Sequence, residues 1–358
     1  MRKIVRSPTG IAILILVPTS IILEVAQVNP TLVFMISAAA IIPLASVIGK
    51  ATEELAKYSS AATGALLNAT FGNVAELIIA IFAIKEGLIV VVQASITGSI
   101  IGNILIVLGL SMFVGGLKHK EQTFSRRTAG TSTTMLTLAA IALIMPALFF
   151  YAQQTGLLEA GFFRLELMCF LVSVILIITY IAGLIFSLHT HKHIFISEWR
   201  VKEAFVWSKR TAIVLLIIST ALVAMESEFL VSAIQPMIGR IGISQTFVGV
   251  IIIAMVGNGA EHSSAIMFAY KNKMDLSVNI ATSSSTQIAL FVAPLLVFIS
   301  AAMGTPMTLA FEIFEVVAIV LSIAIVLTVY SDGESNWFEG LQLVAVYAIF
   351  AVVFFYHP

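Results

Sequence analysis

The stretch GNVAELIIAIFAIKEG, residues 72–87, decides how this sequence is interpreted. Glu76 lies within an apolar segment long enough to span a membrane, where a charge at the helix centre costs about 2.5–3.5 kcal/mol on insertion scales. A similar phrase, GNGAEHSSAIMFAYKN, returns at residues 257–272 and carries Glu261. One such carboxylate would fit a buried structural group, whereas two in matched Gly-Asn-x-x-Glu phrases indicate function.

The composition of the 358-residue chain indicates a membrane protein. Hydrophobic residues make up 59% and charged residues 11% of it, whereas a typical soluble domain has about 25% charged residues. Apolar runs of about 20 residues recur along the chain, so we expect an all-α polytopic membrane protein. The lipid bilayer is the surroundings expected for such apolar runs. The formal net charge of zero argues against a nucleic-acid partner. No GxxxxGK[ST] phrase supports an ATP-driven pump.

About eleven transmembrane helices are expected from the apolar runs. They cover residues 8–27, 31–56, 62–85, 88–116, 128–150, 163–188, 210–237, 244–270, 275–302, 308–330 and 337–356. We divide the chain into a leading helix (residues 1–28), a first five-helix repeat (29–189), a cytoplasmic linker (190–209) and a second five-helix repeat (210–358).

The basic residues predict the orientation of these helices. With the N-terminus in the cytoplasm, all of the 19 Lys and Arg residues except Lys85, Arg164 and Arg240 fall in cytoplasmic segments. Because basic residues concentrate on the cytoplasmic side of membranes, this asymmetry supports the helix count and places the C-terminus outside. The short termini favour a prokaryotic plasma membrane, and an organellar membrane is left open.

The charge pattern makes the two related phrases run in opposite directions. The helix over residues 62–85 runs from inside to outside, and the helix over residues 244–270 runs from outside to inside. Each is followed by a helix interrupted by polar residues, QASITGSIIGN at 93–103 and NIATSSSTQ at 279–287. Inverted repeats with a substrate site near the membrane midplane are typical of secondary transporters.

The polar residues of these four helices predict a cation site. Asn73 and Glu76 lie one turn apart on a helix face, as do Asn258 and Glu261. Where the two pairs meet, carboxylate and amide oxygens converge, and these are the hard ligands that Ca²⁺ takes in sets of about 6–8. Further expected ligands are Ser99, Asn103, Ser284, Ser285 and Gln287.

Glycines and serines of the polar helices have two interpretations. Gly98, Gly102 and the Ser-rich run suit helices that loosen and turn backbone carbonyls toward an ion. Small residues also serve close helix packing in membranes, and for each serine we weigh the two roles equally.

The same carboxylates suggest how transport is coupled. Two carboxylates close together in a low-dielectric site resist being ionised together, and either a divalent cation or protons relieve the repulsion. Cation and protons therefore compete for one site made by Glu76 and Glu261. Glu226 and Glu228 are further candidates for proton coupling. Because they are two residues apart and face different directions, at most one is expected to line a pathway.

Two other groups of polar residues have competing interpretations. Glu53 and Glu54 end the helix over residues 31–56, where they could attract cations, although an interfacial location explains them equally well. In the linker, His189, His191 and His193 alternate. A metal or pH sensor is one interpretation, but we favour a solvated linker because this spacing matches no fixed metal-ligand pattern.

These motifs resemble those of the Ca²⁺/H⁺ antiporter (CAX) family, part of the calcium/cation antiporter superfamily. The resemblance rests on GNVAELI at 72–78, GNGAEH at 257–262 and SSSTQIALFVAP at 283–294, and covers nearly the whole chain. It implies a leading helix followed by two inverted five-helix repeats, with the first two helices of each repeat gating access. It also implies that Glu76 and Glu261 bind Ca²⁺ and are protonated alternately, and that Asn73, Asn258, Asn103 and Gln287 support the site.

The linker departs from the pattern of that family. Members often carry a strongly acidic stretch between the halves, whereas Glu198 and Glu203 stand here among basic residues. We therefore do not expect regulation by Ca²⁺ through this segment.

The sequence predicts a secondary active antiporter, not an enzyme, that expels Ca²⁺ from the cytosol in exchange for external protons by alternating access. Ca²⁺ and protons are its expected substrates, with no cofactor. A Na⁺-coupled exchanger, or one for Mn²⁺ or Mg²⁺, is the first alternative; the GNxxE phrase weighs against Na⁺ but does not rank the divalent cations. A passive cation channel is less favoured because inverted repeats favour alternating access. A homo-oligomer is left open.

Overall fold

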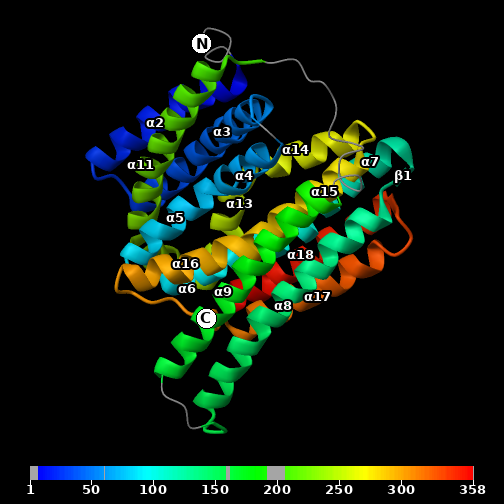
Figure 1. Ribbon diagram of the computed structural model, residues 1–358. Helices are drawn as coiled ribbons and strands as arrows, with labels where there is room; N and C mark the ends of the chain where they lie inside the picture. Colours follow the sequence, from blue (N-terminus) through cyan, green and yellow to red (C-terminus); the bar gives the residue numbers. More distant parts are fainter. Residues whose placement is uncertain (1–6, 60, 159–161, 192–205, 358) are drawn as a thin grey trace.

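Helices make up nearly all of the chain in the computed structural model, which describes residues 7–59, 61–158, 162–191 and 206–357 (Figure 1). The first half contains α2 (Pro8–Val25), α3 (Pro30–Lys57), α4 (Ala61–Phe71), α5 (Val74–Lys85), α6 (Ile89–Ile101), the π-helical turn η1 (Gly102–Val107), α7 (Leu108–His119), strand β1 (Glu121–Thr123), α8 (Arg126–Gln154), α9 (Phe162–Ile185) and the π-helical turn η2 (Phe186–Thr190). The second half contains α11 (Lys209–Ile241), α12 (Gln245–Phe247), the π-helical turn η3 (Val248–Ile253), α13 (Ala254–Gly257), α14 (Gly259–Tyr270), α15 (Met274–Gln287), the π-helical turn η4 (Ile288–Val292), α16 (Ala293–Ala302), α17 (Ile313–Val329), β2 (Glu334–Asn336) and α18 (Trp337–Tyr356).

Local capping explains where several of these helices begin. Ser208 accepts a hydrogen bond from the Thr211 N–H at 3.2 Å and so caps α11. Asn29 caps α3 by accepting from the Thr31 N–H, and Pro30 occupies the first helical position. Proline is favoured there because the N–H it lacks would have no partner within the helix. These polar residues stop one apolar helix from running into the next.

Eight of the described helical segments are long and apolar enough to cross a membrane, and the bent pair Gln245–Gly257 and Gly259–Tyr270 forms a ninth. Large apolar side chains face outward: Leu14 is 57%, Ile178 61% and Ile217 64% exposed. Such a surface suits lipid rather than water, because exposed apolar patches of this extent are rare on soluble proteins. The expected class of all-α polytopic membrane protein is therefore confirmed.

Three of the eleven predicted spans do not form single long helices. The span over residues 244–270 is the bent pair Gln245–Gly257 and Gly259–Tyr270. The span over residues 62–85 is divided into α4 and α5, of 11 and 12 residues. The span over residues 308–330 forms only the 17-residue α17, which begins five residues late, at Ile313. The Glu312 N–H there donates to the Glu315 carboxylate at 3.0 Å, and this contact fixes the start of the helix. The count of eleven spans stays a prediction.

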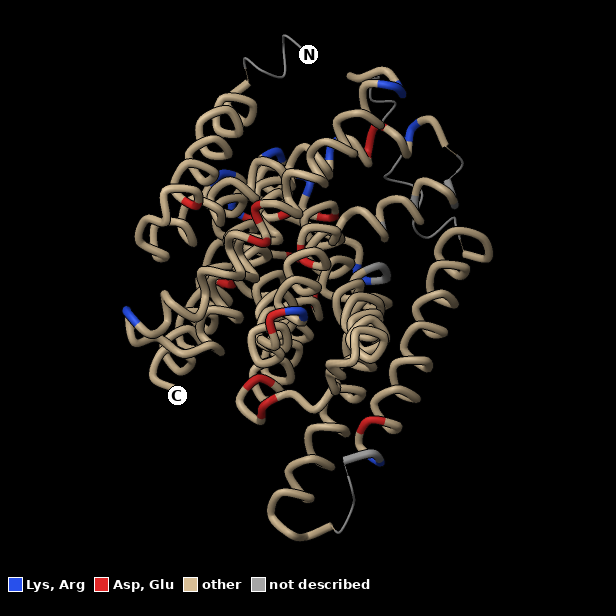
Figure 2. The backbone as a smooth tube through the Cα atoms, turned by 90° about the vertical axis from the view of Figure 1, so that its left-hand side faces the viewer, with Lys and Arg blue, Asp and Glu red and all other residues tan. Residues whose placement is uncertain are grey.

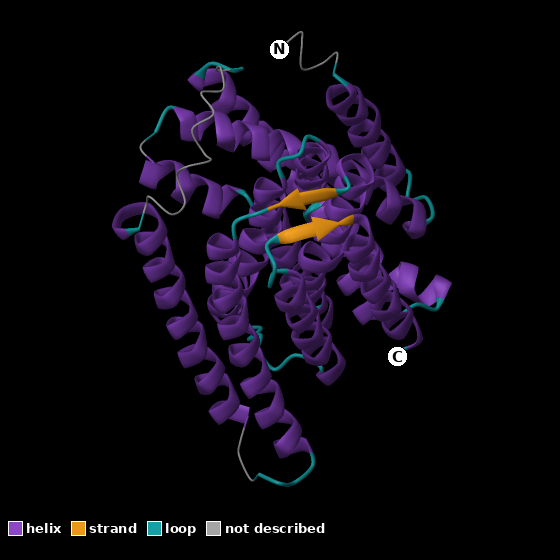
Figure 3. Ribbon diagram, turned by 90° about the vertical axis from the view of Figure 1, so that its right-hand side faces the viewer, coloured by secondary structure: helices purple, strands orange, loops and turns teal. Residues whose placement is uncertain are grey.

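The two strands form a small sheet on one side of the molecule, which we call the sheet side (Figure 3). β1 and β2 pair antiparallel, with Glu121 opposite Asn336. Beside them, Lys118 Nζ at the end of α7 donates to the Tyr270 carbonyl at the end of α14, at 3.3 Å. The connectors that follow α7, α14 and α17 therefore lie together. The sequence did not predict this sheet, because three-residue strands in polar connectors show no hydrophobic alternation.

The opposite side carries the connectors that follow α5 and α16. Gln93 Nε2, near the start of α6, donates to the Thr308 carbonyl at 2.9 Å in the connector after α16. The α6–η1–α7 segment thus runs toward the sheet side, and the α15–η4–α16 segment runs away from it. In the same way α14 ends at the sheet side and α5, packed against α16, ends at the other. The two halves are inverted, as the sequence predicts.

Charged residues follow the same division. Figure 2 shows most of the Lys and Arg residues in the half of the molecule that holds the N-terminus. Among the described residues, Lys118, Lys120, Lys271 and Lys273, which the sequence assigns to the cytoplasm, lie at or just after the ends of α7 and α14 on the sheet side. Lys85, assigned to the outside, ends α5 on the opposite side. The orientation of the chain in the membrane stays a prediction.

With α2 alongside, helices α3 and α11 pack along each other at the upper left of Figure 1. We call them the α3–α11 pair. α3 contacts α13 and α14 of the second half, and α11 contacts α5 of the first half. The approach is close: a Cβ added to Gly259 would lie 2.9 Å from Cγ2 of Ile42 in α3. Each half therefore supplies a helix that covers the broken helix of the other half.

The linker is described only at its ends. Most of residues 190–209, His193 included, lies outside the described residues. His189 lies in the turn η2 and is exposed. The domain boundaries expected from the sequence stay predictions.

Candidate cation-binding site

Both Gly-Asn-x-x-Glu phrases break their helices. Asn73 separates α4 from α5 with φ −104° and ψ 23°, and Asn258 separates α13 from α14 with φ −90° and ψ 5°. At the second break the helix axis bends by 63°. Glu76 and Glu261 therefore lie in the first turns of α5 and α14, not in the middle of continuous helices as the sequence predicted.

The position at a helix start explains how the apolar core accepts these carboxylates. The first turn of a helix has N–H groups without partners inside the helix. Together with the macrodipole they create a partial positive charge, which favours a negative group in that turn by about 0.3–1 kcal/mol or more when partly buried. α5 and α14 run in opposite directions from the centre, so two such turns face each other there.

Residues of both halves hold Glu261 in a hydrogen-bond network. Ser284 Oγ donates to Glu261 Oε2 at 2.7 Å. Asn103 Nδ2 donates to Ser284 Oγ at 3.0 Å and to Asn258 Oδ1 at 3.4 Å. Asn258 Nδ2 in turn donates to Ser99 Oγ at 2.9 Å. The network thus joins the polar segments of α6, η1 and α15 to the break between α13 and α14.

The first half leaves oxygen atoms without a partner. Asn73 Nδ2 donates to Gln287 Oε1 at 2.8 Å. Among the described residues, no hydrogen bond reaches the buried Asn73 Oδ1 or Glu76 Oε2. Glu76 also borders a small cavity of about 10 Å³, room for about one water. The cavity is lined by Glu76, Ala80, Ser95, Ile96, Ser99, Ile288, Val292 and Leu296.

Glu76 lies directly against the second break. A Cβ on Gly257 would come within 2.6 Å of Glu76 Cγ and 3.0 Å of its Oε1, so only glycine leaves room for this carboxylate. Glu261 lies four residues after Gly257, in the first turn of α14. Both carboxylates therefore lie at the break between α13 and α14. Sequence reasoning missed the role of Gly257, although a glycine before the asparagine in both phrases was the available signal.

The structure brings eight of the nine predicted ligands into one region. They are Asn73, Glu76, Ser99, Asn103, Asn258, Glu261, Ser284 and Gln287. Ser285 does not belong with them, because its Oγ contacts the Ile100 carbonyl at 3.2 Å and packs α15 against α6. Gly98 likewise serves close packing rather than a loosened helix. That the eight residues bind a cation stays a prediction.

The chemistry of this region suits a hard cation. Within the described parts of the chain, no group of three or more His, Cys, Asp or Glu side chains could hold a metal ion. A cation here would be bound by two carboxylates together with amide, hydroxyl and backbone oxygens. Ca²⁺ and Mg²⁺ prefer such oxygen ligands, whereas softer metals prefer nitrogen and sulfur.

The two glutamates of α11 differ in environment. Glu226 is fully buried and accepts a hydrogen bond from Ser20 Oγ of α2 at 2.5 Å. Glu228 is exposed. At most one of the two therefore lies inside the protein, as their spacing implies. A part in proton coupling stays a prediction for both.

We expect Gly257→Ala to displace Glu76 and lower the apparent affinity for Ca²⁺ at least about tenfold, a loss of about 1.4 kcal/mol. The Glu76 side chain is able to move aside, so the protein should still fold. Gly239→Ala is the control, because nothing lies within 4 Å of a Cβ added there. The measurement is the Ca²⁺ concentration that half-saturates uptake into vesicles. An unchanged value for Gly257→Ala would contradict the close packing of Glu76 against α13.

Comparison with known proteins identifies the family. The chain matches the sodium/calcium exchanger protein family over residues 29–189 and 211–356. It belongs to that family. The matched segments contain both Gly-Asn-x-x-Glu phrases and all eight residues of the candidate site.

Individual relatives cover nearly the whole chain. The Ca²⁺/H⁺ antiporter of Synechocystis sp. is 39% identical over 99% of this chain and 98% of its own length. The Ca²⁺/H⁺ antiporter ChaA of Bacillus subtilis is 43% identical over 95% of this chain and 96% of its own. The solved structure of native YfkE superimposes with a TM-score of 0.85 at 40% identity, over 98% of this chain and 99% of that one. The resemblance to Ca²⁺/H⁺ antiporters in the sequence motifs is thereby confirmed.

Proposed function

We propose that this membrane protein is a secondary active antiporter that exchanges Ca²⁺ for protons. The observation that carries the proposal is the approach of Glu76 and Glu261, from helices of opposite direction, inside an apolar protein. Relatives about 40% identical over nearly the full chain are named Ca²⁺/H⁺ antiporters. They favour Ca²⁺ over the Na⁺-coupled alternative, and a transporter over an enzyme.

Charge at the site accounts for the exchange. Two ionised carboxylates repel each other in a medium of low dielectric, and the site is stabilised when positive charge enters it. Ca²⁺ bound between Glu76 and Glu261 supplies that charge, and so do protons bound to the same oxygens. Because the two compete, the site is emptied of one substrate as it fills with the other. Exchange follows when the loaded site faces alternate sides of the membrane.

The surrounding residues have separate parts in this proposal. Asn73 Oδ1 and Glu76 Oε2, which lack hydrogen-bond partners, are the oxygens most available to an incoming cation. Ser284 holds Glu261 in place through its hydroxyl, and Asn103 holds Ser284. Asn258, Ser99 and Gln287 complete the oxygen-rich lining. Glu226 would accept protons among α2 and α11, away from the hydrogen bonds of the site.

We place the N-terminus in the cytoplasm and the C-terminus outside, in a prokaryotic plasma membrane. The support is the concentration of basic residues on the sheet side and in the half that holds the N-terminus (Figure 2). In that orientation the protein expels Ca²⁺ from the cytosol as protons enter.

Transport into vesicles tests the proposal. The purified protein is reconstituted, a pH gradient is imposed, and radioactive Ca²⁺ is followed. We expect Ca²⁺ to accumulate against its gradient and the accumulation to collapse when a protonophore is added. Downhill flow alone would indicate a channel. Accumulation driven by a Na⁺ gradient at constant pH would indicate the Na⁺-coupled alternative, and competition by Mn²⁺ or Mg²⁺ ranks the divalent cations.

A further inference from the structure

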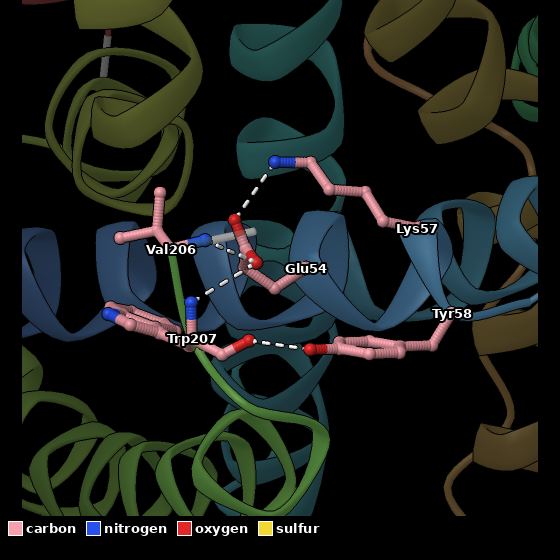
Figure 4. A network of polar contacts seen from close by, with 5 residues as sticks. All are labelled: Glu54, Lys57, Tyr58, Val206 and Trp207. Carbon is pink, nitrogen blue, oxygen red and sulfur yellow. Dashed lines mark hydrogen bonds and ion pairs between the residues drawn. The ribbon is translucent and has the colours of Figure 1, made fainter. Parts of the chain in front are cut away.

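A network of polar contacts ties the end of the linker to the end of α3 (Figure 4). Glu54 Oε2 accepts hydrogen bonds from the backbone N–H groups of Val206 and Trp207, at 3.1 and 3.3 Å. Glu54 Oε1 accepts from Lys57 Nζ at 2.9 Å. The Tyr58 hydroxyl donates to the Trp207 carbonyl at 3.0 Å. Trp207 lies two residues before α11, so these contacts join the last turn of α3 to the start of α11.

The network is built around a buried charge. Only 2% of Glu54 is exposed, so the carboxylate does not present itself to cations, and the interpretation of Glu54 as a cation attractor is not supported. Hydrogen bonds to an ionised group are about twice as strong as neutral ones. Lys50 Nζ adds a cation–π contact, 5.3 Å from the centre of the Trp207 ring. Removal of the carboxylate would take away the acceptor that the N–H groups of Val206 and Trp207 share.

The helices joined here are those that cover the candidate cation site. α3 packs on α13 and α14, which flank Asn258 and of which α14 carries Glu261, and α11 packs on α5, which carries Glu76. Along most of their length the pair is held by apolar packing, which permits sliding because it has no direction. At the far end Arg240 Nη1 of α11 donates to Oδ1 of Asn29, the cap of α3, at 2.9 Å. The contacts of Glu54 are directional and fix the two helices at one end.

We propose that Glu54 is a positioning residue for exchange: it fixes the start of α11 to the end of α3, so that the α3–α11 pair moves over the site as one body. The inference rests on the proposed exchange function. It differs from a role in binding, because Glu54 belongs to neither the site nor its hydrogen-bond network. Loss of the contacts should therefore slow the movement of the loaded site and leave its affinity for Ca²⁺ unchanged.

The first test removes the carboxylate. We expect Glu54→Ala to lower the maximal rate of proton-driven Ca²⁺ uptake about tenfold, with the half-saturating Ca²⁺ concentration changed by less than about twofold. Glu86→Ala is the control, because Glu86 is an exposed glutamate at the end of another helix, α5, and it should exchange as the unaltered protein does. Glu54→Gln, which keeps the shape and loses the charge, is measured in parallel in case the alanine variant does not fold.

The second test restores the connection by other means. Tyr58 and Val206 belong to the network, one from each of the two joined segments, and are 39% and 61% exposed. In a Cys169→Ser, Glu54→Ala background, Tyr58→Cys and Val206→Cys are joined by a short, reducible thiol cross-linker. We expect cross-linking to recover at least about half of the lost rate and reduction to abolish the recovery. Variants with a single added cysteine should not respond.

The outcomes separate the inference from the proposed function. If cross-linking blocks exchange, the contact must open in each cycle and the inference is wrong. It is equally wrong if Glu54→Ala and Glu54→Gln exchange at the normal rate, or if only their affinity for Ca²⁺ falls. If the unaltered protein itself fails to accumulate Ca²⁺ under a pH gradient, the proposed function is wrong and the inference falls with it.

Discussion

Glu76→Gln and Glu261→Gln should each lower proton-driven Ca²⁺ uptake by at least about 100-fold, a loss of about 2.7 kcal/mol or more. Glutamine keeps the size of the side chain and removes its charge. At position 261 its amide oxygen can still accept the hydrogen bond that Ser284 donates to Glu261. The loss should therefore come from the missing charge and the missing proton acceptor, and not from altered packing.

Uptake into vesicles measures this effect, with Ca²⁺-induced proton release as a second signal. Glu86→Gln is the control, since Glu86 ends the same α5 helix and is exposed. Both site variants should run as folded protein in size-exclusion chromatography. Near-normal uptake by either variant would remove that residue from the exchange mechanism. Ca²⁺ binding without proton release would show that the carboxylates are not the proton carriers.

Gly98→Ala should destabilise the folded protein by about 3 kcal/mol or more, because overpacking against a backbone atom has no relief from side-chain movement. A Cβ on Gly98 would lie 2.0 Å from the Val250 carbonyl oxygen, where α6 crosses η3. On the other side of the crossing, a Cβ on Gly249 would lie 2.5 Å from the Ala94 Cβ. The two segments touch backbone to backbone.

Gly102→Ala is the matched control for this prediction. It lies one turn further along, and the nearest atom to an added Cβ is Ile106 Cγ2 at 3.8 Å, an ordinary contact. The fraction of protein that stays folded and monodisperse in detergent after heating compares the two variants. We expect a large loss for Gly98→Ala and little change for Gly102→Ala. Equal melting curves would mean that α6 and η3 do not cross as closely as described.

The sequence predicts the membrane class, the inversion and the members of the candidate site. It does so because each depends on the placement of charged residues, and a charge in apolar surroundings costs free energy. Glu76 and Glu261 are carboxylates in apolar surroundings, so a repeat of them stands out without any alignment. The basic residues alternate along the chain, and that alternation gives the directions of the helices before any contact is known.

The breaks at Asn73 and Asn258 could not be predicted in this way. Hydropathy continues across both breaks, and only the backbone dihedrals and the packing of the two halves reveal them. Glu54 illustrates a second limit. Its partners Val206 and Trp207 lie about 150 residues away in sequence, and a glutamate at a helix end gives no sign of such a contact. The sequence left the role of Ser285 open, because a serine that binds a carbonyl and one that faces a site look alike in sequence.

The small sheet has a mechanical consequence. Beside it, Gln122 Nε2 of β1 donates to the Ala269 carbonyl and to Asn272 Oδ1, both at 2.9 Å. Strand pairing and these hydrogen bonds hold the ends of α7, α14 and α17 together as one rigid unit. These ends cannot separate without breaking several hydrogen bonds at once. An ion pathway on the sheet side would therefore have to open by sliding of the α3–α11 pair, and not by a hinge motion of the helices that end at the sheet.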